Sequence, residues 1–221
     1  MITFKEIRNH PDIKAYIQAG NDALGIMGYT EHGFAHARKT AEVAAEVLLR
    51  YNATDREVEL GRIAGYMHDI GNMVNRENHA HTGATVAFQI LNGLRMVSEE
   101  IATVVSAIGN HDEGSGKVIN RVAAALILAD KSDVRRSRVR APNKDYYRED
   151  IHDRVNYAVT QSKLVVKEDV DEIRLELTID THICPVIEYF KIFIERMFMC
   201  QGASEKFGAH FSLMINGNIL M

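Results

Sequence analysis

The distribution of histidine is the feature of this sequence that points most directly to chemistry. The chain has ten histidines among 221 residues. Six of them, His32, His36, His68, His79, His81 and His111, lie within 80 positions. Histidines that only satisfied a core or a surface would be scattered along the chain. The clustering therefore favours a metal or catalytic site, for which the candidate ligands are His36, His68, Asp69, His79, His111 and Asp130.

These residue types suit a pair of transition-metal ions. Neutral imidazoles favour first-row transition ions over Mg²⁺ or Ca²⁺, which prefer cages of oxygen ligands. Adjacent residues on a helix point about 100° apart, so His68 can hold one ion while Asp69 reaches a second. Two such ions keep a surplus of positive charge, which a bridging hydroxide and an anionic substrate would balance. A pair of this kind also lowers the pKa of bound water and clamps both oxygens of an in-line displacement, so phosphate esters suit it.

Helical signals run through most of the chain and must position these ligands. Thr3 with Glu6, and Thr54 with Glu57, form capping-box patterns, and Pro11 suits a first helical turn. Gly28 is typical of a helix stop. The spacing of apolar residues predicts helices at about 11–27, 33–51, 54–70, 79–93, 98–109, 119–133, 145–162 and 184–200. Candidate ligands from different helices can converge in the core of a bundle.

Strand signals appear only near the end of the sequence. Residues 173–179 alternate apolar and polar side chains, and residues 162–167 could pair with them across the EDVDE turn. Asn216-Gly217 between two apolar runs predicts a hairpin. We therefore expect a mainly α protein with a helical core at 1–160 and a small α+β extension at 161–221. The strands of the extension are a possible homodimer edge.

Composition narrows the classes of partner. The formal net charge is −4, so there is no basic excess for binding a nucleic-acid duplex. No apolar run approaches the roughly 20 residues that span a bilayer, and the N-terminus lacks a signal-peptide pattern. Cys184 and Cys200 cannot form a disulfide framework and fit buried thiols in a reducing compartment. A cytoplasmic location away from membranes is expected.

The order His36, His68-Asp69 and Asp130 resembles the H…HD…D signature of the HD-domain superfamily of metal-dependent phosphohydrolases. HGFAHARKTAEVA around His36 and AGYMHDIGN around His68 are similar to the first two blocks of that family. The resemblance covers about residues 30–135 and implies a helical bundle with His36, His68, Asp69 and Asp130 as metal ligands. His79 and His111 resemble the two additional histidines of dinuclear members, which implies two divalent ions: Mn, Fe, Ni or Zn.

One segment departs from a branch of that family. Members that cleave cyclic di-GMP carry a double histidine followed by a Gly-Tyr-Pro turn. Here the corresponding segment is NHDEGSGKVIN, with one histidine and no Tyr-Pro. The cyclic di-GMP activity is therefore not expected for this chain.

Several charged residues near the ligands are candidates for contact with substrate. Arg forks match phosphate oxygens, and each candidate also has the alternative interpretation of a solvated surface charge. The residues are His32, Lys39, Lys131, Arg135 and Arg136. Asp133, three residues after Asp130, shares its helical face and could orient a ligand.

The resemblance implies a phosphohydrolase, mono- or diesterase, acting on a nucleotide or another small phosphate ester. A metal-bridging hydroxide would be the nucleophile, with His68 and Asp69 as the central catalytic residues. Two alternatives stay open. The same ligand set resembles that of HD-type mixed-valent di-iron oxygenases, and a nucleotide-sensing module would bind without turnover.

Overall fold

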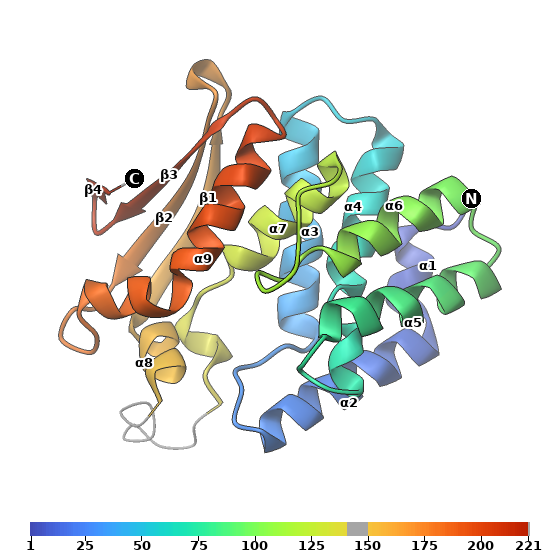
Figure 1. Ribbon diagram of the computed structural model, residues 1–221, viewed down its shortest axis with the longest axis horizontal. Coiled ribbons are helices and arrows are strands. Elements are labelled where there is room, and N and C mark those ends of the chain that lie inside the picture. The colour runs from blue at the N-terminus through green and yellow to red at the C-terminus, as the bar shows by residue number, and fades with distance from the viewer. Residues whose placement is uncertain (141–149, 221) are drawn as a thin grey trace.

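Nine α-helices and a four-stranded sheet make up most of the residues that the computed structural model describes, which are 1–140 and 150–220 (Figure 1). The helices are α1 (Phe4–Asn9), α2 (Pro11–Ile26), α3 (Phe34–Arg50), α4 (Asp55–Met67), α5 (His79–Gly93), α6 (Ser98–Gly109), α7 (Arg121–Lys131), α8 (Ile151–Ala158) and α9 (Val186–Glu205). The strands are β1 (Val159–Lys167), β2 (Glu172–Ile179), β3 (His210–Ile215) and β4 (Asn218–Ile219). Short 3₁₀ turns are η1 (Ile70–Met73), η2 (Arg136–Arg138) and η4 (Glu168–Val170). The mainly α class predicted from the sequence is confirmed.

Local signals for helix ends and turns are confirmed. Thr3 and Thr54 each form a complete capping box with the glutamate three residues later. Gly28 follows α2 with φ of 83°, a left-handed conformation that favours glycine. Asn216 and Gly217 have φ values of 51° and 83°, which is the pattern of a tight turn between β3 and β4.

The helix expected at 145–162 is wrong at its C-terminal end. Residues 145–149 lie outside the described part of the chain, and α8 covers only Ile151–Ala158. Asp150 caps its start by accepting hydrogen bonds from the backbone of His152 and Asp153. From Val159 the chain is a strand, because Val159 pairs with Ile179 in an antiparallel ladder with β2. Tertiary pairing overrides helical spacing at this point.

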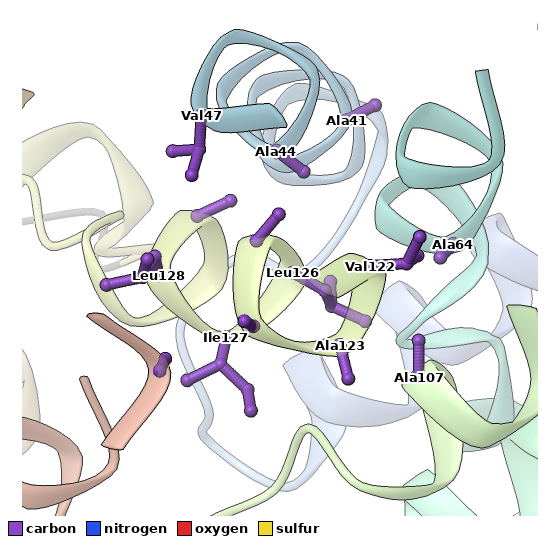
Figure 2. Close-up of a cluster of buried hydrophobic side chains, with 14 of the residues drawn as sticks. Ala41, Ala44, Val47, Ala64, Ala107, Val122, Ala123, Leu126, Ile127 and Leu128 are labelled. Carbon is purple, nitrogen blue, oxygen red and sulfur yellow. The ribbon is translucent and has the colours of Figure 1, made fainter. Parts of the chain in front are cut away.

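Helix α7 runs through the centre of the hydrophobic core. Its residues 122–129 are all buried, with exposed fractions of 0–2%. A helix that is apolar on all sides is normally enclosed by other elements. Figure 2 shows Val122, Leu126 and Leu128 of α7 among small side chains of α3, α4 and α6, including Ala44, Ala64 and Ala107. Because α7 is enclosed, Asp130 and Lys131 at its end are carried into the interior.

Small residues allow α3 and α4 to pack closely. A Cβ atom on Gly65 would lie 2.8 Å from the Cα atom of Ala41 on α3. Only glycine permits that approach. The rings of His36, near the start of α3, and His68, just after α4, are 5.0 Å apart. Both histidines therefore lie at the same end of this helix pair.

The sheet has the strand order β1-β2-β3-β4. β1 and β2 form the antiparallel hairpin predicted across the EDVDE turn, and β3 and β4 are also antiparallel. β2 and β3 are parallel, with α9 as the connection between them. α9 packs against α7 and against β2 and β3, so buried residues form one core across both parts of the chain. The division at residue 160 stays a prediction. Among the described helices, none combines the length and apolar character needed to cross a bilayer.

Candidate metal centre

The six candidate ligands come from five segments and meet at one end of the helical core. His36 lies in the first turn of α3, and His68-Asp69 follow α4 directly. His79 is the first residue of α5, His111 follows α6, and Asp130 lies near the end of α7. The four histidines are no more than 3% exposed. The carboxylates of Asp69 and Asp130 are 9% and 14% exposed.

Each of the four imidazoles is held through its Nδ1 atom by an oxygen that accepts a hydrogen bond. The acceptors are Asp133 Oδ2 for His36 at 2.8 Å, Gly65 O for His68 at 2.8 Å, Arg76 O for His79 at 3.0 Å and Ile108 O for His111 at 2.6 Å. Because these oxygens accept, each Nδ1 carries a hydrogen. In a neutral ring, the Nε2 atom then carries the lone pair that a metal ligand needs.

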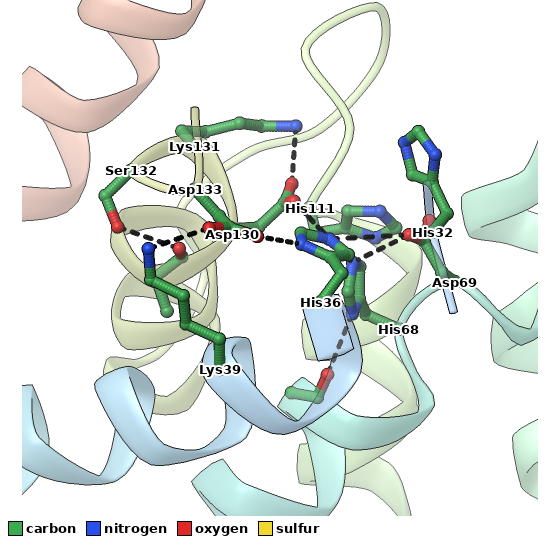
Figure 3. Close-up of polar contacts among 12 residues, drawn as sticks. His32, His36, Lys39, His68, Asp69, His111, Asp130, Lys131, Ser132 and Asp133 are labelled. Carbon is green, nitrogen blue, oxygen red and sulfur yellow. Dashed lines mark hydrogen bonds and ion pairs between the residues drawn. The ribbon is translucent and has the colours of Figure 1, made fainter. Parts of the chain in front are cut away.

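The four Nε2 atoms form two close pairs. His36 Nε2 lies 3.2 Å from His68 Nε2, and His79 Nε2 lies 3.2 Å from His111 Nε2. Two lone pairs at that distance repel each other unless a cation lies between or beside them. Asp130 Oδ1 is 3.2 Å from His36 Nε2 (Figure 3). Within residues 1–140 and 150–220, two groups have three ligand atoms within 4.8 Å of one another: His36, His68 and Asp130, and His68, Asp69 and His111.

Asp69 lies between the two histidine pairs. Its Oδ2 atom is 3.1 Å from His68 Nε2, and its Oδ1 atom is 3.5 Å from His79 Nε2. Asn72 holds the carboxylate in place by donating a hydrogen bond to Oδ1 at 2.8 Å. Oδ2 is buried and has no hydrogen-bond partner in the described part of the chain. An orphaned carboxylate oxygen beside imidazole lone pairs fits a bound cation.

The two buried carboxylates of the cluster need positive charge nearby. Burial opposes ionisation of Asp69 and Asp130, yet His68 and Lys131 hold the pKa of these carboxyls well below the usual range. Burial alone would lower the pKa of His68, but Asp69 and Asp130 raise it to about 10. A proton on His68 and a metal ion are therefore alternative sources of the same charge.

Asp133 forms the second layer behind His36. This fully buried carboxylate accepts from His36 Nδ1 and is paired with Lys39 Nζ and Arg135 Nε, each at 2.8 Å. Burial would raise its pKa, but the hydrogen bond from His36 and the charges of Arg138 and Lys39 hold that pKa far below the usual range. Asp133 is thus an ionised acceptor that fixes the His36 ring.

Lys131 connects the cluster to α9 through residues that the sequence did not single out. Lys131 Nζ is 2.9 Å from Asp130 Oδ2 and 2.5 Å from Glu113 Oε2. Glu113 in turn accepts from Arg196 Nε at 2.7 Å. Glu113 lies two residues after His111, so its place in the NHDE segment could have marked it as a candidate. Arg196 lies in a distant amphipathic helix and carries no local signal.

The remaining predicted contacts are dispersed. Arg136 stacks on the Tyr157 ring at 4.6 Å and donates to the Tyr157 carbonyl, so the structure does not bring it to the cluster. Lys39 and Arg135 reach only Asp133 and its surroundings. The His32 ring lies 5.6 Å from the His36 ring. His81, which is not among the candidate ligands or substrate contacts, is exposed.

A cavity of about 470 Å³ adjoins the cluster. Arg76 lies in its wall and links it to the ligands, because Arg76 Nη1 is 3.3 Å from His79 Nε2 and 3.9 Å from Asp69 Oδ1. His32, Arg138 and Arg196 line it as well. Glu113 also lines this side, but it is paired with Lys131 and Arg196. The side of the cavity near the cluster therefore keeps an excess of cations and suits an anion.

Parts of the chain are similar to known proteins. Residues 33–135 match the family model of the HD domain. "Uncharacterized protein MJ1020" of Methanocaldococcus jannaschii is 27% identical over 162 residues, which are 63% of this chain. The match spans 62% of that relative's length. The crystal structure of a predicted HD superfamily hydrolase from an uncultured Thermotogales bacterium aligns with a TM-score of 0.44 and 21% identity, covering 60% of this chain and 75% of that one.

The matched segment contains all six candidate ligands and ends just after Asp133. HD domains bind divalent metal ions, and the clustered histidines and aspartates described above occupy this segment. The match to the HD-domain model is limited to this segment, which is less than half of the chain.

Proposed function

We propose that this protein is a metal-dependent phosphohydrolase with two divalent transition-metal ions. One ion would be held by His36, His68 and Asp130, and the other by His79 and His111, with Asp69 shared between them. The observation that carries the proposal is the position of Asp69. Its two oxygens face different histidine pairs, and the oxygen nearer His68 accepts no hydrogen bond within the described residues.

Such a metal pair, when bound, would supply an activated water and polarise the phosphoryl oxygens. The protein's own residues prepare the rest. The Nδ1 hydrogen bonds hold the imidazole rings in one orientation. Asn72 holds the Asp69 carboxylate in the same way. Arg76 and Arg196 give the adjoining cavity positive charge for the phosphate. A small phosphate ester is the substrate class that fits these features.

Lys131 contributes a fixed positive charge at the edge of the site. Burial would lower its pKa, but Asp130 and Glu113 raise it, so the ammonium group stays charged at neutral pH. It faces Asp130 Oδ2, the carboxylate oxygen opposite to the one near His36. Lys131 therefore holds Asp130 ionised and oriented for metal binding.

Metal content and hydrolysis test the proposal together. We expect about two transition-metal ions per chain after anaerobic purification. Release of phosphate from phenyl phosphate or nucleotides should then proceed without oxygen and with Mn²⁺. His79→Ala should reduce the metal content by about one ion, whereas His81→Ala, a matched change at the exposed neighbour, should leave it unchanged.

Three results would contradict the proposal. A metal content of one ion or fewer after reconstitution would exclude the dinuclear centre. A manganese form that is inert to every phosphate ester, together with an iron form that consumes O₂ with an organic substrate, would support the oxygenase alternative. A protein that binds nucleotides tightly and turns over nothing would support the sensor alternative.

A further inference from the structure

One wall of the cavity is formed by α8 and α9, which follow all the metal ligands in the sequence. Asp153 and Asn156 come from α8, and Phe193 comes from α9. All three lie outside the segment that matches the HD domain. Figure 1 shows α8 and α9 side by side beyond that helical core, and the two helices are in contact. This wall is therefore a feature of the present chain and a candidate for its substrate selection.

Asp153 is the unusual residue of that wall. It is only 5% exposed, yet its carboxylate has neither a hydrogen bond nor an ion pair within the described residues. Its unpartnered oxygens are not fully enclosed by protein atoms. They remain accessible from the cavity that Asp153 lines. Burial and the nearby Asp150 raise its pKa. A nearly buried carboxylate without a partner costs stability, which indicates that a ligand completes it.

The two ends of the cavity have opposite hydrogen-bonding character. Arg76 contacts the metal ligands, and Arg196 is connected to Asp130 through Glu113 and Lys131. The titratable groups that act on Asp153 are instead Asp150, which raises its pKa, and His152 and Arg140, which lower it. Asn156 donates through Nδ2 to the His152 carbonyl at 2.8 Å, which leaves its Oδ1 atom as an acceptor. The end near the metal ligands thus offers donors for phosphate, and the α8 end offers acceptors.

We propose that Asp153 selects phosphate esters whose organic part carries a hydroxyl or ammonium group, by accepting a hydrogen bond from that group. The proposal rests on the phosphohydrolase function given above. In this arrangement the phosphate lies against Arg76 and the metal centre, and the organic part extends past Phe193 to α8. The cavity of about 470 Å³ is at the small end of ligand pockets, which span roughly 300–1,000 Å³. It suits a molecule of the size of a sugar phosphate or a mononucleotide.

Kinetics of Asp153→Ala with three probes tests the selection. Ribose 5-phosphate supplies hydroxyl donors, O-phosphoethanolamine supplies an ammonium donor, and phenyl phosphate supplies neither. For at least one of the two donor-bearing substrates, kcat/KM should fall about tenfold or more, mainly through KM, because a hydrogen bond to a charged acceptor is lost. For phenyl phosphate it should stay within about twofold. Glu195→Gln, which removes an exposed carboxylate from α9 beside Arg196, is the matched control and should change neither.

A second variant identifies the donor and separates binding from folding. Asp153→Asn keeps an oxygen acceptor, so it should retain part of the activity on a hydroxylated substrate. It should lose as much as Asp153→Ala on an ammonium substrate. The melting temperature of Asp153→Asn should be equal to or higher than that of the wild type, because an unpartnered buried charge is removed. A carboxylate needed only for folding would give a lower melting temperature.

The outcomes distinguish this proposal from the phosphohydrolase proposal. If phenyl phosphate is cleaved but Asp153→Ala lowers all three activities equally, or none, the role of Asp153 is wrong and the hydrolase stands. If no ester is cleaved, the hydrolase fails, and equilibrium binding of ribose 5-phosphate and O-phosphoethanolamine to the wild type and Asp153→Ala decides the role of Asp153. Equal affinities, or no binding by the wild type, would overturn it.

Discussion

At the scale of single residues, Asp69 and Asp130 have different relations to the two histidine pairs. Asp69 presents one oxygen to each pair, whereas Asp130 faces only His36 and His68 and is held from behind by Lys131. We expect Asp69→Ala to remove both metal ions and nearly all activity. Asp130→Ala should weaken mainly one ion. Elemental analysis and turnover of the two variants check this, and retention of both ions with near-normal turnover in Asp69→Ala would refute a shared carboxylate.

Asp133 acts on the metal centre only through His36. Asp133→Asn should weaken metal affinity about 10–100-fold, as expected when the partner that orients a ligand histidine is altered. Lys39→Met is the matched control, because Lys39 contacts the other oxygen of Asp133 and leaves the bond to His36 intact. Competition with a metal chelator measures both affinities. Equal losses in the two variants would mean that the local charge matters rather than the orientation of His36.

At the scale of elements, the chain Arg196–Glu113–Lys131 ties α9 and the segment after α6 to α7. Burial opposes ionisation of Glu113, but Lys131 and Arg196 lower its pKa from the usual 4.5. A carboxyl group whose pKa is lowered on folding stabilises the folded protein at pH values above its unfolded-state pKa. This contribution is lost as the pH falls toward the folded-state pKa. Glu113→Gln should therefore cost about 1–3 kcal/mol at pH 7, for a partly exposed pair, and progressively less below about pH 4.5.

Urea unfolding of the metal-free protein between pH 3 and pH 7 measures this difference. Glu46→Gln removes an exposed carboxylate from α3 and should change stability by no more than about 0.5 kcal/mol at any pH. A Glu113→Gln effect that is independent of pH would mean that the carboxylate is not ionised in the folded protein, contrary to its contacts.

The docking of α5 on η1 depends on the absence of a side chain at Gly71. A Cβ atom there would collide with the His79 carbonyl oxygen and the Gly83 backbone nitrogen. Gly71→Ala should therefore displace the start of α5, destabilise the fold by more than about 2 kcal/mol and weaken binding of the metal that His79 would hold. Gly93→Ala is the control, because its added Cβ meets nothing within 4 Å and should be neutral or stabilising. Equal melting temperatures for the two variants would contradict this packing.

At the scale of the whole molecule, the buried core is continuous between the helical part and the sheet. Cys200 on α9 is 1% exposed, and burial raises the pKa of its thiol to about 12. In a Cys184→Ala variant, Cys200 should react with a thiol reagent only when the whole chain unfolds. Its labelling midpoint in urea should equal the midpoint of helix loss by circular dichroism. Labelling at a lower urea concentration would show that residues 161–221 unfold separately.

The sequence by itself determined the local features. Thr3 and Thr54 fix helix starts and Asn216-Gly217 fixes a turn, because these signals act within three or four residues. It also supplied the identities of the clustered imidazoles and carboxylates, because their types and order suffice to indicate a metal centre. The extent of α8 was beyond such reasoning, because the strand at Val159 is set by pairing with Ile179.

Only the tertiary structure decided which side chains meet. The orientation of Asp69 between two histidine pairs depends on where α3, α4 and α5 pack, and helical periodicity gives a buried face without naming its partner. The same limit applies to Arg196, which reaches Glu113 across 83 positions of sequence, and to Arg136, which turns to Tyr157 instead of the cluster. The parallel pairing of β2 with β3 likewise needs α9 to cross over the sheet. Contacts between residues distant in sequence follow from packing, and local patterns do not encode packing partners.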